Sequence, residues 1–218
     1  MKELEIQHQA DPTVPIPYDG ITHKRVPKTW KKKTYAEAAS EKTVYFKGPD
    51  HPLSNLYPCE LWIDGYEFHS SEGAYQFFKA MTMADNSTSK WDKGDYWNKA
   101  KKIQETKNPW DAMDMGKFNT DDKWKHIKID VMRAILLEKY TQCKKYQEYL
   151  DKSGKSRLIE NTTHHFWGGK QEKGLNMLGL LHQWIRDDSD KNNLQPYTQQ
   201  VPGNSRTYSV KNSLTTNH

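Results

Sequence analysis

The chain has 218 residues, a formal net charge of +5, 34% hydrophobic residues and a mean hydropathy of −1.04. This length fits one domain diluted by polar ends, and the modest excess of positive charge is more typical of a solvated surface than of a polyanion-binding one. Cys59 and Cys143 are too few for a disulfide framework, and no stretch approaches the roughly 20 apolar residues of a membrane span. We expect a soluble, intracellular and cytoplasmic protein.

Both ends of the chain differ in composition from its middle. Residues 1–40 are polar and proline-dotted, with the basic run Lys31–Lys33, and predict a flexible arm with one short helix at Tyr35–Ser40. Residues 188–218 are rich in Gln, Asn, Thr and Ser and predict a disordered tail. Residues 41–187 are therefore expected to form the single domain. Nucleic-acid binding through the basic arm is one hypothesis, which deletion of residues 1–40 would test.

Short strands are expected at the start of the domain. Val44–Phe46 and Glu60–Ile63 alternate in polarity, and Asp64-Gly65 makes a turn before Tyr66–Phe68. Helical patterns follow, at Ser71–Ala84, roughly Trp97–Glu105, Pro109–Met115, Asp122–Tyr140, Tyr146–Lys152 and Leu175–Asp187. The fold class predicted is a mainly helical α+β domain with a small β-sheet.

The first of these helices has an unusual polar stripe. Ser70 and Ser71 are good N-cap candidates, and Glu72, Gln76 and Lys79 recur at helical spacing on one face. The other faces are apolar and suited to packing. The stripe either faces solvent or lines a pocket.

General catalytic motifs are absent: the sequence has no dinucleotide-binding glycine pattern, no Walker loop, no zinc-protease motif and no nucleophile elbow. His164 and His165 are adjacent, but neighbouring side chains point in different directions, so we expect no metal site there. Taken singly, the remaining polar residues are ordinary turn formers and core residues.

Taken in order, they form a pattern. Six motifs follow one another along the chain: Ser54-Asn55-Leu56-Tyr57; Glu72, Gln76 and Lys79-Ala80; Trp124 with Val131-Met132; Glu160, Thr162 and Trp167-Gly168; Gly174–Gly179; and Arg186. Together they resemble the NADAR, or YbiA-like, family over roughly residues 44–187. The resemblance implies a single YbiA-like domain that hydrolyses N-glycosidic bonds. Substrates of such proteins include phosphoribosylated intermediates of riboflavin synthesis and ADP-ribose attached to guanine.

The resemblance also implies a ribose-phosphate site built from a glutamate, a tryptophan and an aspartate. The glutamate and tryptophan match Glu72 and Trp124, whereas His164 occupies the aspartate position. Glu72 is then the catalytic carboxylate that stabilises an oxocarbenium-like state, and His164 is an acid or base. Glu160 would supply a second carboxylate only if its loop folds inward, and a loop anchor is the simpler interpretation.

The same resemblance implies which side chains bind the substrate. We expect Trp124 to stack on the ribose or base, Lys79 to bind a phosphate, and Gln76 and Asn55 to bind ribose hydroxyls. The other expected binding residues are Tyr57, Trp167, Gly168 and Asn176. No metal or other cofactor is expected. The partner is a free or nucleic-acid-linked ADP-ribosyl or phosphoribosyl substrate, with no membrane involved.

Departures from the family pattern leave one alternative open. Besides His164, the chain has Lys117 where an arginine is frequent and Asp121 where a basic residue is usual. A lysine loses the bidentate phosphate recognition of arginine. The alternative function is an inactive module that binds ADP-ribose or a nucleotide without cleaving it.

Overall fold

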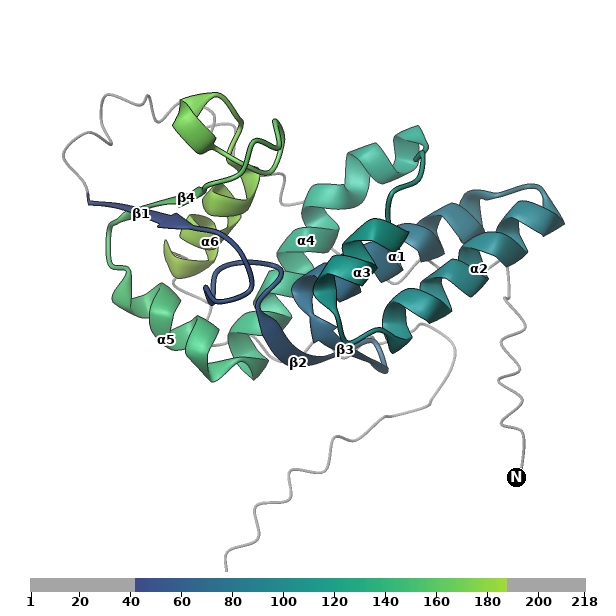
Figure 1. The fold of residues 1–218 in the computed structure, drawn as a ribbon, viewed down its shortest axis with the longest axis horizontal. Coiled ribbons are helices and arrows are strands. Elements are labelled where there is room, and N and C mark those ends of the chain that lie inside the picture. The colour runs from purple at the N-terminus through teal and green to yellow at the C-terminus, as the bar shows by residue number, and fades with distance from the viewer. Residues whose placement is uncertain (1–41, 188–218) are drawn as a thin grey trace, which may run out of the picture.

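A computed structural model describes residues 42–187 of the chain (Figure 1). The arm expected at residues 1–40 and the tail expected at 188–218 lie outside the described residues. The elements are β1 (Thr43–Phe46), β2 (Pro58–Ile63), β3 (Tyr66–Ser70), α1 (Ser71–Asn86), α2 (Lys90–Glu105), α3 (Pro109–Met115), α4 (Asp122–Gln142), α5 (Lys144–Lys152), β4 (Arg157–Glu160), the 3₁₀ turn η3 (Lys170–Glu172) and α6 (Met177–Asp187). The mainly helical α+β prediction is confirmed.

The strands form two separate two-stranded sheets rather than one small sheet. β2 and β3 pair antiparallel around the expected turn, where Asp64 and Gly65 both have positive φ. β1 instead pairs in parallel with β4, a strand that lay partly in an expected loop. Four residues are too few to show strand periodicity, so only the long-range pairing with β1 defines this strand.

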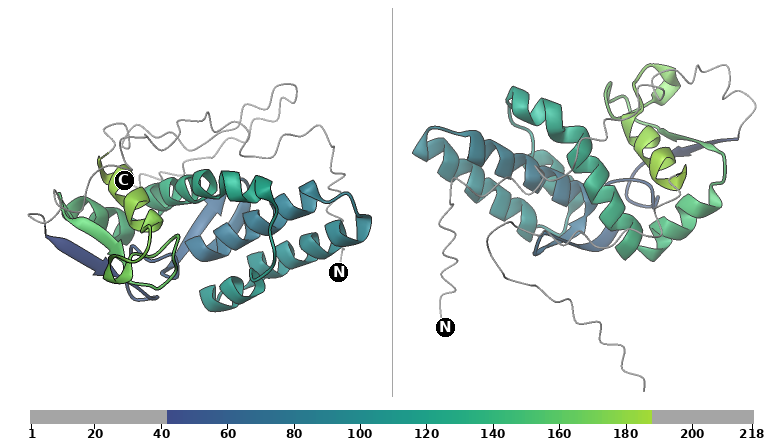
Figure 2. Two further views of the ribbon diagram at one scale, coloured as in Figure 1. Left: turned by 90° about the horizontal axis from the view of Figure 1, so that it is seen from above. Right: turned by 180° about the vertical axis from the view of Figure 1, so that it is seen from behind.

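Helix α4 is the central element of the described fold. It lies between two groups of elements, with α1, α2 and α3 on one side and β1, β4, α5 and α6 on the other (Figures 1 and 2). Its buried stripe includes Val131 and, four and five residues later, Ile135 and Leu136, which lie on the same side of the helix. No helix within residues 42–187 is long and apolar enough to cross a membrane.

Three helix starts differ from prediction, and one of them is α5, which begins at Lys144 instead of Tyr146. α2 begins at Lys90 instead of Trp97, and Ser89 caps this start. Only Ala100 and Ile103 of α2 are buried, so its first turns have no apolar stripe from which the start could be predicted. α6 begins at Met177 instead of Leu175.

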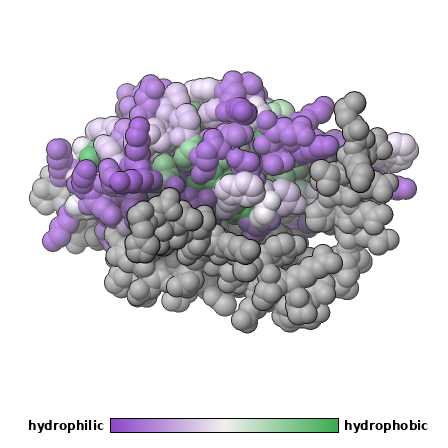
Figure 3. All heavy atoms as spheres, turned by 90° about the horizontal axis from the view of Figure 1, so that it is seen from below, coloured by the Kyte–Doolittle hydropathy of each residue, from purple (hydrophilic) through white to green (hydrophobic). Residues whose placement is uncertain are grey.

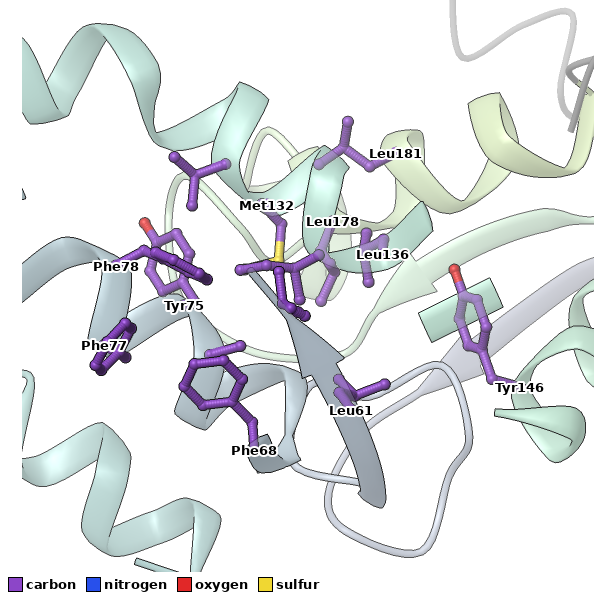
Figure 4. Close-up of a cluster of buried hydrophobic side chains, with 14 of the residues drawn as sticks. Leu61, Phe68, Tyr75, Phe77, Phe78, Met132, Leu136, Tyr146, Leu178 and Leu181 are labelled. Carbon is purple, nitrogen blue, oxygen red and sulfur yellow. The ribbon is translucent and has the colours of Figure 1, made fainter. Parts of the chain in front are cut away.

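The core is aromatic around the start of α1. Phe68 of β3 packs against Phe77 and Phe78 of α1, with ring centroids 5.2 and 5.8 Å away (Figure 4). Met132 of α4 and Leu178 of α6 lie in the same cluster. One face of the described surface is largely hydrophilic, with small hydrophobic areas (Figure 3). The apolar faces of α1 are thus buried, which holds its polar stripe in a fixed direction.

Candidate functional site

Glu72 lies in the first turn of α1, where backbone N–H groups favour a negative charge. Ser70 caps the helix by accepting a hydrogen bond from the Gly73 N–H at 3.0 Å. The Glu72 N–H donates to the carbonyl of Asn55 at 3.0 Å, which ties this turn to the loop before β2. The cap and this bond fix the position of the backbone that carries the Glu72 carboxylate.

The polar stripe of α1 is a connected set. Gln76 Nε2 donates to Glu72 Oε1 at 2.7 Å. Burial raises the pKa of Glu72, while the Gln76 hydrogen bond and the charge of Lys79 oppose that rise. Burial also lowers the pKa of Lys79, whose Nζ donates to the Gly116 carbonyl at 2.6 Å and lies 4.5 Å from the Phe118 ring centroid. The stripe is therefore held by its own contacts and by the loop after α3.

Gly116 fits tightly against this stripe. A Cβ atom at this position would lie 2.0 Å from Oε1 of Gln76. Only a residue without a side chain allows the Gln76 amide to keep its bond to Glu72. Two departures from the family pattern lie nearby. Lys117 is exposed and forms an ion pair with Asp114. Asp121 caps α4 by accepting a hydrogen bond from the Trp124 N–H at 2.8 Å.

An aromatic wall stands beside the carboxylate. Tyr75 follows Glu72 on α1, and its ring centroid lies 5.2 Å from Trp124 and 5.6 Å from Trp167. The Tyr75 hydroxyl is hydrogen-bonded to both indoles, and burial together with the Glu72 charge raises its pKa. Trp124 itself is only 3% exposed, so it also belongs to the core. The sequence motifs do not include Tyr75, although its ring contacts the predicted residues Trp124 and Trp167.

A second carboxyl group reaches the site from β4. Burial, followed by the charge of Glu72, raises the pKa of Glu160 to about 7. The Oε2 atom of Glu160 is buried. The strand end is fixed by Asn176, whose Oδ1 accepts from the Glu160 N–H at 3.0 Å and whose Nδ2 donates to the Leu158 carbonyl at 2.8 Å. The charge of Glu72 therefore acts on the Glu160 carboxyl group, while the Glu160 backbone is held by Asn176.

Three buried acceptor oxygens belong to Glu160 and to two residues that hydrogen-bond to Glu72. Asn55 Oδ1, Gln76 Oε1 and Glu160 Oε2 have no hydrogen-bond partner within residues 42–187. The other end of the Asn55 amide donates to the sulfur of Met132 at 3.4 Å. Buried oxygens of this kind are normally satisfied, so the site calls for donors such as hydroxyl groups or water.

His164 has a different position from the one expected of a catalytic acid. Its Nδ1 accepts from the N–H groups of Phe166 and Trp167, both at 3.2 Å, so the ring caps its own loop. Burial and the charge of Lys128 lower its pKa. No contact joins His164 to Glu72 in the part of the chain that the structure describes.

The remaining predicted residues support the loops around the site. Gly168 packs so closely on Thr162 that a Cβ would lie 2.3 Å from its Oγ1, and Tyr57 lies over the Nζ of Lys139 at 5.8 Å. Both ends of the Asn176 amide are bonded to backbone, which gives it a positioning role. The structure thus places Gln76 and Lys79 beside Glu72, and it packs Trp124 and Trp167 against Tyr75 of the same helix. Direct substrate binding by any of these residues stays a prediction.

A shallow cavity of about 220 Å³ follows Glu160 along the chain. Its lining is polar and basic: Thr162, Thr163, His165, Lys170, Gln171, Lys173 and Gly174. Such groups suit an anion such as a phosphate. Within residues 42–187 no group of three or more His, Cys, Asp or Glu side chains is arranged to hold a metal ion.

Comparison with known proteins identifies the domain. The NADAR domain matches residues 39–188. This chain belongs to the NADAR family. An N-glycosidase of Nostoc punctiforme is 32% identical over 154 residues, which cover 67% of the chain and 92% of that protein.

Two further matches of this NADAR chain are more distant. A riboflavin biosynthesis protein of Vibrio vulnificus is 28% identical over 155 residues, covering 68% of the chain but 39% of that larger protein. The NMR structure of the Escherichia coli protein YbiA has a TM-score of 0.54 at 24% identity, over 67% of the chain and 83% of YbiA, and shows the shared fold.

Proposed function

We propose that this NADAR domain hydrolyses the ribose–nitrogen bond of an ADP-ribosyl or phosphoribosyl substrate. One observation carries the proposal: Glu72 presents a desolvated carboxylate beside an aromatic wall and among buried oxygens that lack donors. Membership of the family supports it, as does the name N-glycosidase borne by the Nostoc relative.

The chemistry of the bond explains why such a site suits it. As the C1′–N bond breaks, positive charge spreads over the anomeric carbon and the ring oxygen. The Glu72 carboxylate stabilises this charge electrostatically. Gln76 holds the carboxylate in place through its 2.7 Å hydrogen bond. The unpartnered oxygen of Asn55 suits a ribose hydroxyl, which is a hydrogen-bond donor.

The phosphate end of the substrate is assigned to basic groups. Lys79 uses one of its protons on the Gly116 carbonyl and retains two others for a phosphate oxygen. The cavity lined by Lys170 and Lys173 offers a second position for an anionic group, which suits the diphosphate of ADP-ribose. Tyr75, Trp124 and Trp167 exclude water and offer apolar contact to the ribose or base.

The test compares Glu72→Gln with Glu105→Gln, a matched change of an exposed glutamate at the end of α2. The probes are ADP-ribosylated guanosine and a phosphoribosylated riboflavin precursor, with release of the free base measured by mass spectrometry. We expect Glu72→Gln to lower kcat by about 10²–10⁴-fold, whereas Glu105→Gln keeps the wild-type rate. Equal rates in both variants would contradict the role of Glu72.

A second candidate function is binding without cleavage. It is favoured by His164, which stands at the aspartate position and is engaged in its own loop. Calorimetry with ADP-ribose would then show tight binding while no probe is turned over. Multiple turnover of either probe excludes this candidate.

A further inference from the structure

The site needs an acid as well as a stabilising carboxylate. A purine or pyrimidine nitrogen that leaves with the bonding electron pair is a poor leaving group until it gains a proton. His164 is capped into its own loop, and its pKa is lowered, so its ring is neutral at physiological pH. Another side chain has to carry the proton.

Glu160 and Glu72 differ in what surrounds them. Glu72 has a hydrogen-bond donor in Gln76, a cation in Lys79 and the N-terminal N–H groups of α1, all of which favour its ionised form. Oε2 of Glu160 is buried without a donor, and the charge that acts on Glu160 is the negative charge of Glu72. When two nearby carboxyl groups have such different surroundings, one keeps a proton while the other ionises.

The position of Glu160 is also fixed more firmly than a loop residue requires. Its N–H is held by Asn176, and its carbonyl accepts from the N–H groups of Thr162 at 2.9 Å and Gly169 at 2.8 Å. A Cβ on Gly169 would lie 2.8 Å from the Cβ of Asn176, so β4, the loop after it and Asn176 pack as one unit. This unit fixes the backbone that carries the second carboxyl group.

We propose that Glu160 is the general acid of the reaction and Glu72 the carboxylate that stabilises the ribosyl cation. The inference rests on the proposed function. As the C1′–N bond breaks, its electron pair goes to the nitrogen, which takes the proton from the Glu160 carboxyl group. Water then adds to C1′ and returns a proton to the Glu160 carboxylate. The products are the ribose with a hydroxyl group at C1′ and the free base, and Glu160 is again protonated.

The pH dependence follows from the groups that face the pair. Tyr75 and Lys79 on α1 interact with Glu72, Glu72 acts on Glu160, and His165, Lys170 and Lys173 lie on the loop that follows Glu160. Tyr75 stays neutral near pH 7 because burial and the Glu72 charge raise its pKa well above the usual value, and the charge of Lys79 lowers the pKa of Glu72. An acid acts only while it is protonated. The rate should therefore fall as the pH rises through the pKa of Glu160, about 7, and fall again in acid as Glu72, whose pKa burial also raises, gains a proton.

The experiment compares the full chain with its Glu160→Gln, Glu160→Asp, Glu72→Gln and Glu105→Gln variants. The kcat for ADP-ribosylated guanosine is measured against pH. We expect Glu160→Gln to lose about 100-fold or more in kcat and to lose the fall above neutral pH. Glu160→Asp keeps that fall at a reduced rate because it keeps a proton to donate, and Glu105→Gln matches the wild type.

A second readout needs no turnover. Infrared difference spectra report the C=O stretch of a protonated carboxyl group, which we expect in the wild type at neutral pH and not in Glu160→Gln. In Glu72→Gln this signal should disappear at a lower pH than in the wild type, because the neighbouring negative charge is gone.

Each outcome bears on one of the two claims. If Glu160→Gln keeps the wild-type rate and pH profile, or if no protonated carboxyl group is present at neutral pH, Glu160 is not the acid, while hydrolysis through Glu72 stands. If the wild type turns over neither ADP-ribosylated guanosine nor the phosphoribosyl probe, the proposed function fails and the acid role fails with it.

Discussion

Replacement of Gly116 by alanine should displace Gln76 and weaken the hold on Glu72. Gly116 ends α3 with φ −77° and ψ −1°, angles that alanine adopts without strain, so the substitution adds only a methyl group. That methyl would lie 2.0 Å from Gln76 Oε1 and 2.3 Å from its Cδ. The buried amide has to move, and its bond to the Glu72 carboxylate is lost.

The size of the effect follows from the interactions that change. Overpacking of a buried site costs about 1–3 kcal/mol, and a hydrogen bond to a charged group contributes about 1.5–3 kcal/mol. We therefore expect the free energy of unfolding to fall by about 2 kcal/mol and Tm to fall by about 4–8 °C. Loss of the donor should also raise the pKa of Glu72 further, because Gln76 stabilises its ionised form.

The assay is a double-mutant cycle in urea, with Gln76→Ala as the second change. If the methyl acts by striking Gln76, the cost of Gly116→Ala should drop below about 0.5 kcal/mol in the Gln76→Ala background. Gly94→Ala is the matched control: Gly94 lies inside α2, and a Cβ there meets nothing within 4 Å. It should stabilise the helix by up to about 1 kcal/mol. A cost near 2 kcal/mol in both backgrounds would refute the assigned clash.

Asn176→Ala should lower the free energy of unfolding, measured in urea, by about 2–4 kcal/mol, because it leaves two buried backbone groups without partners. Asn176→Gly should cost less, because φ is +51° here and glycine adopts this angle without strain. Equal costs would show that the backbone angle is irrelevant. Cys143 has a pKa lowered to about 6, chiefly by the hydrogen bond from Cys59, so thiolate ultraviolet absorbance should appear as the pH rises through about 6. Cys143→Ser should abolish this step, and Cys59→Ala, which removes the donor, should shift it to higher pH. An unchanged step in both variants would assign it to another group.

The helix that carries Glu72 was predictable because its signals are local. Capping by Ser70 and the spacing of Glu72, Gln76 and Lys79 depend on neighbours within one or two turns, and the structure retains both. The first turns of α2 lack such a signal, since they are polar all round and are held by packing against α1. The expected helix start at Trp97 was wrong for that reason.

The second carboxyl group was only weakly predictable from the sequence. Glu160 belongs to a four-residue strand whose partner, β1, lies at the start of the domain. Its approach to Glu72 depends on that pairing and on the amide of Asn176, and neither leaves a periodic pattern. For His164, the family position indicated an acid or base, but the ring's hydrogen bonds to its own loop depend on a backbone conformation that residue types alone do not specify.

The loop that meets Glu72 depends on a buried lysine in α4. Lys139 is fully buried, and its Nζ donates to the Ser54 carbonyl at 2.8 Å while lying 4.9 Å from the Tyr146 ring centroid. Burial of an ammonium group is costly unless it is paired, and a carbonyl and an aromatic face compensate only in part. The next residue, Asn55, accepts the Glu72 N–H through its carbonyl. Lys139 therefore fixes the loop at the point where it contacts the helix that carries Glu72, so α4 supports the candidate site through Lys139 as well as through Trp124.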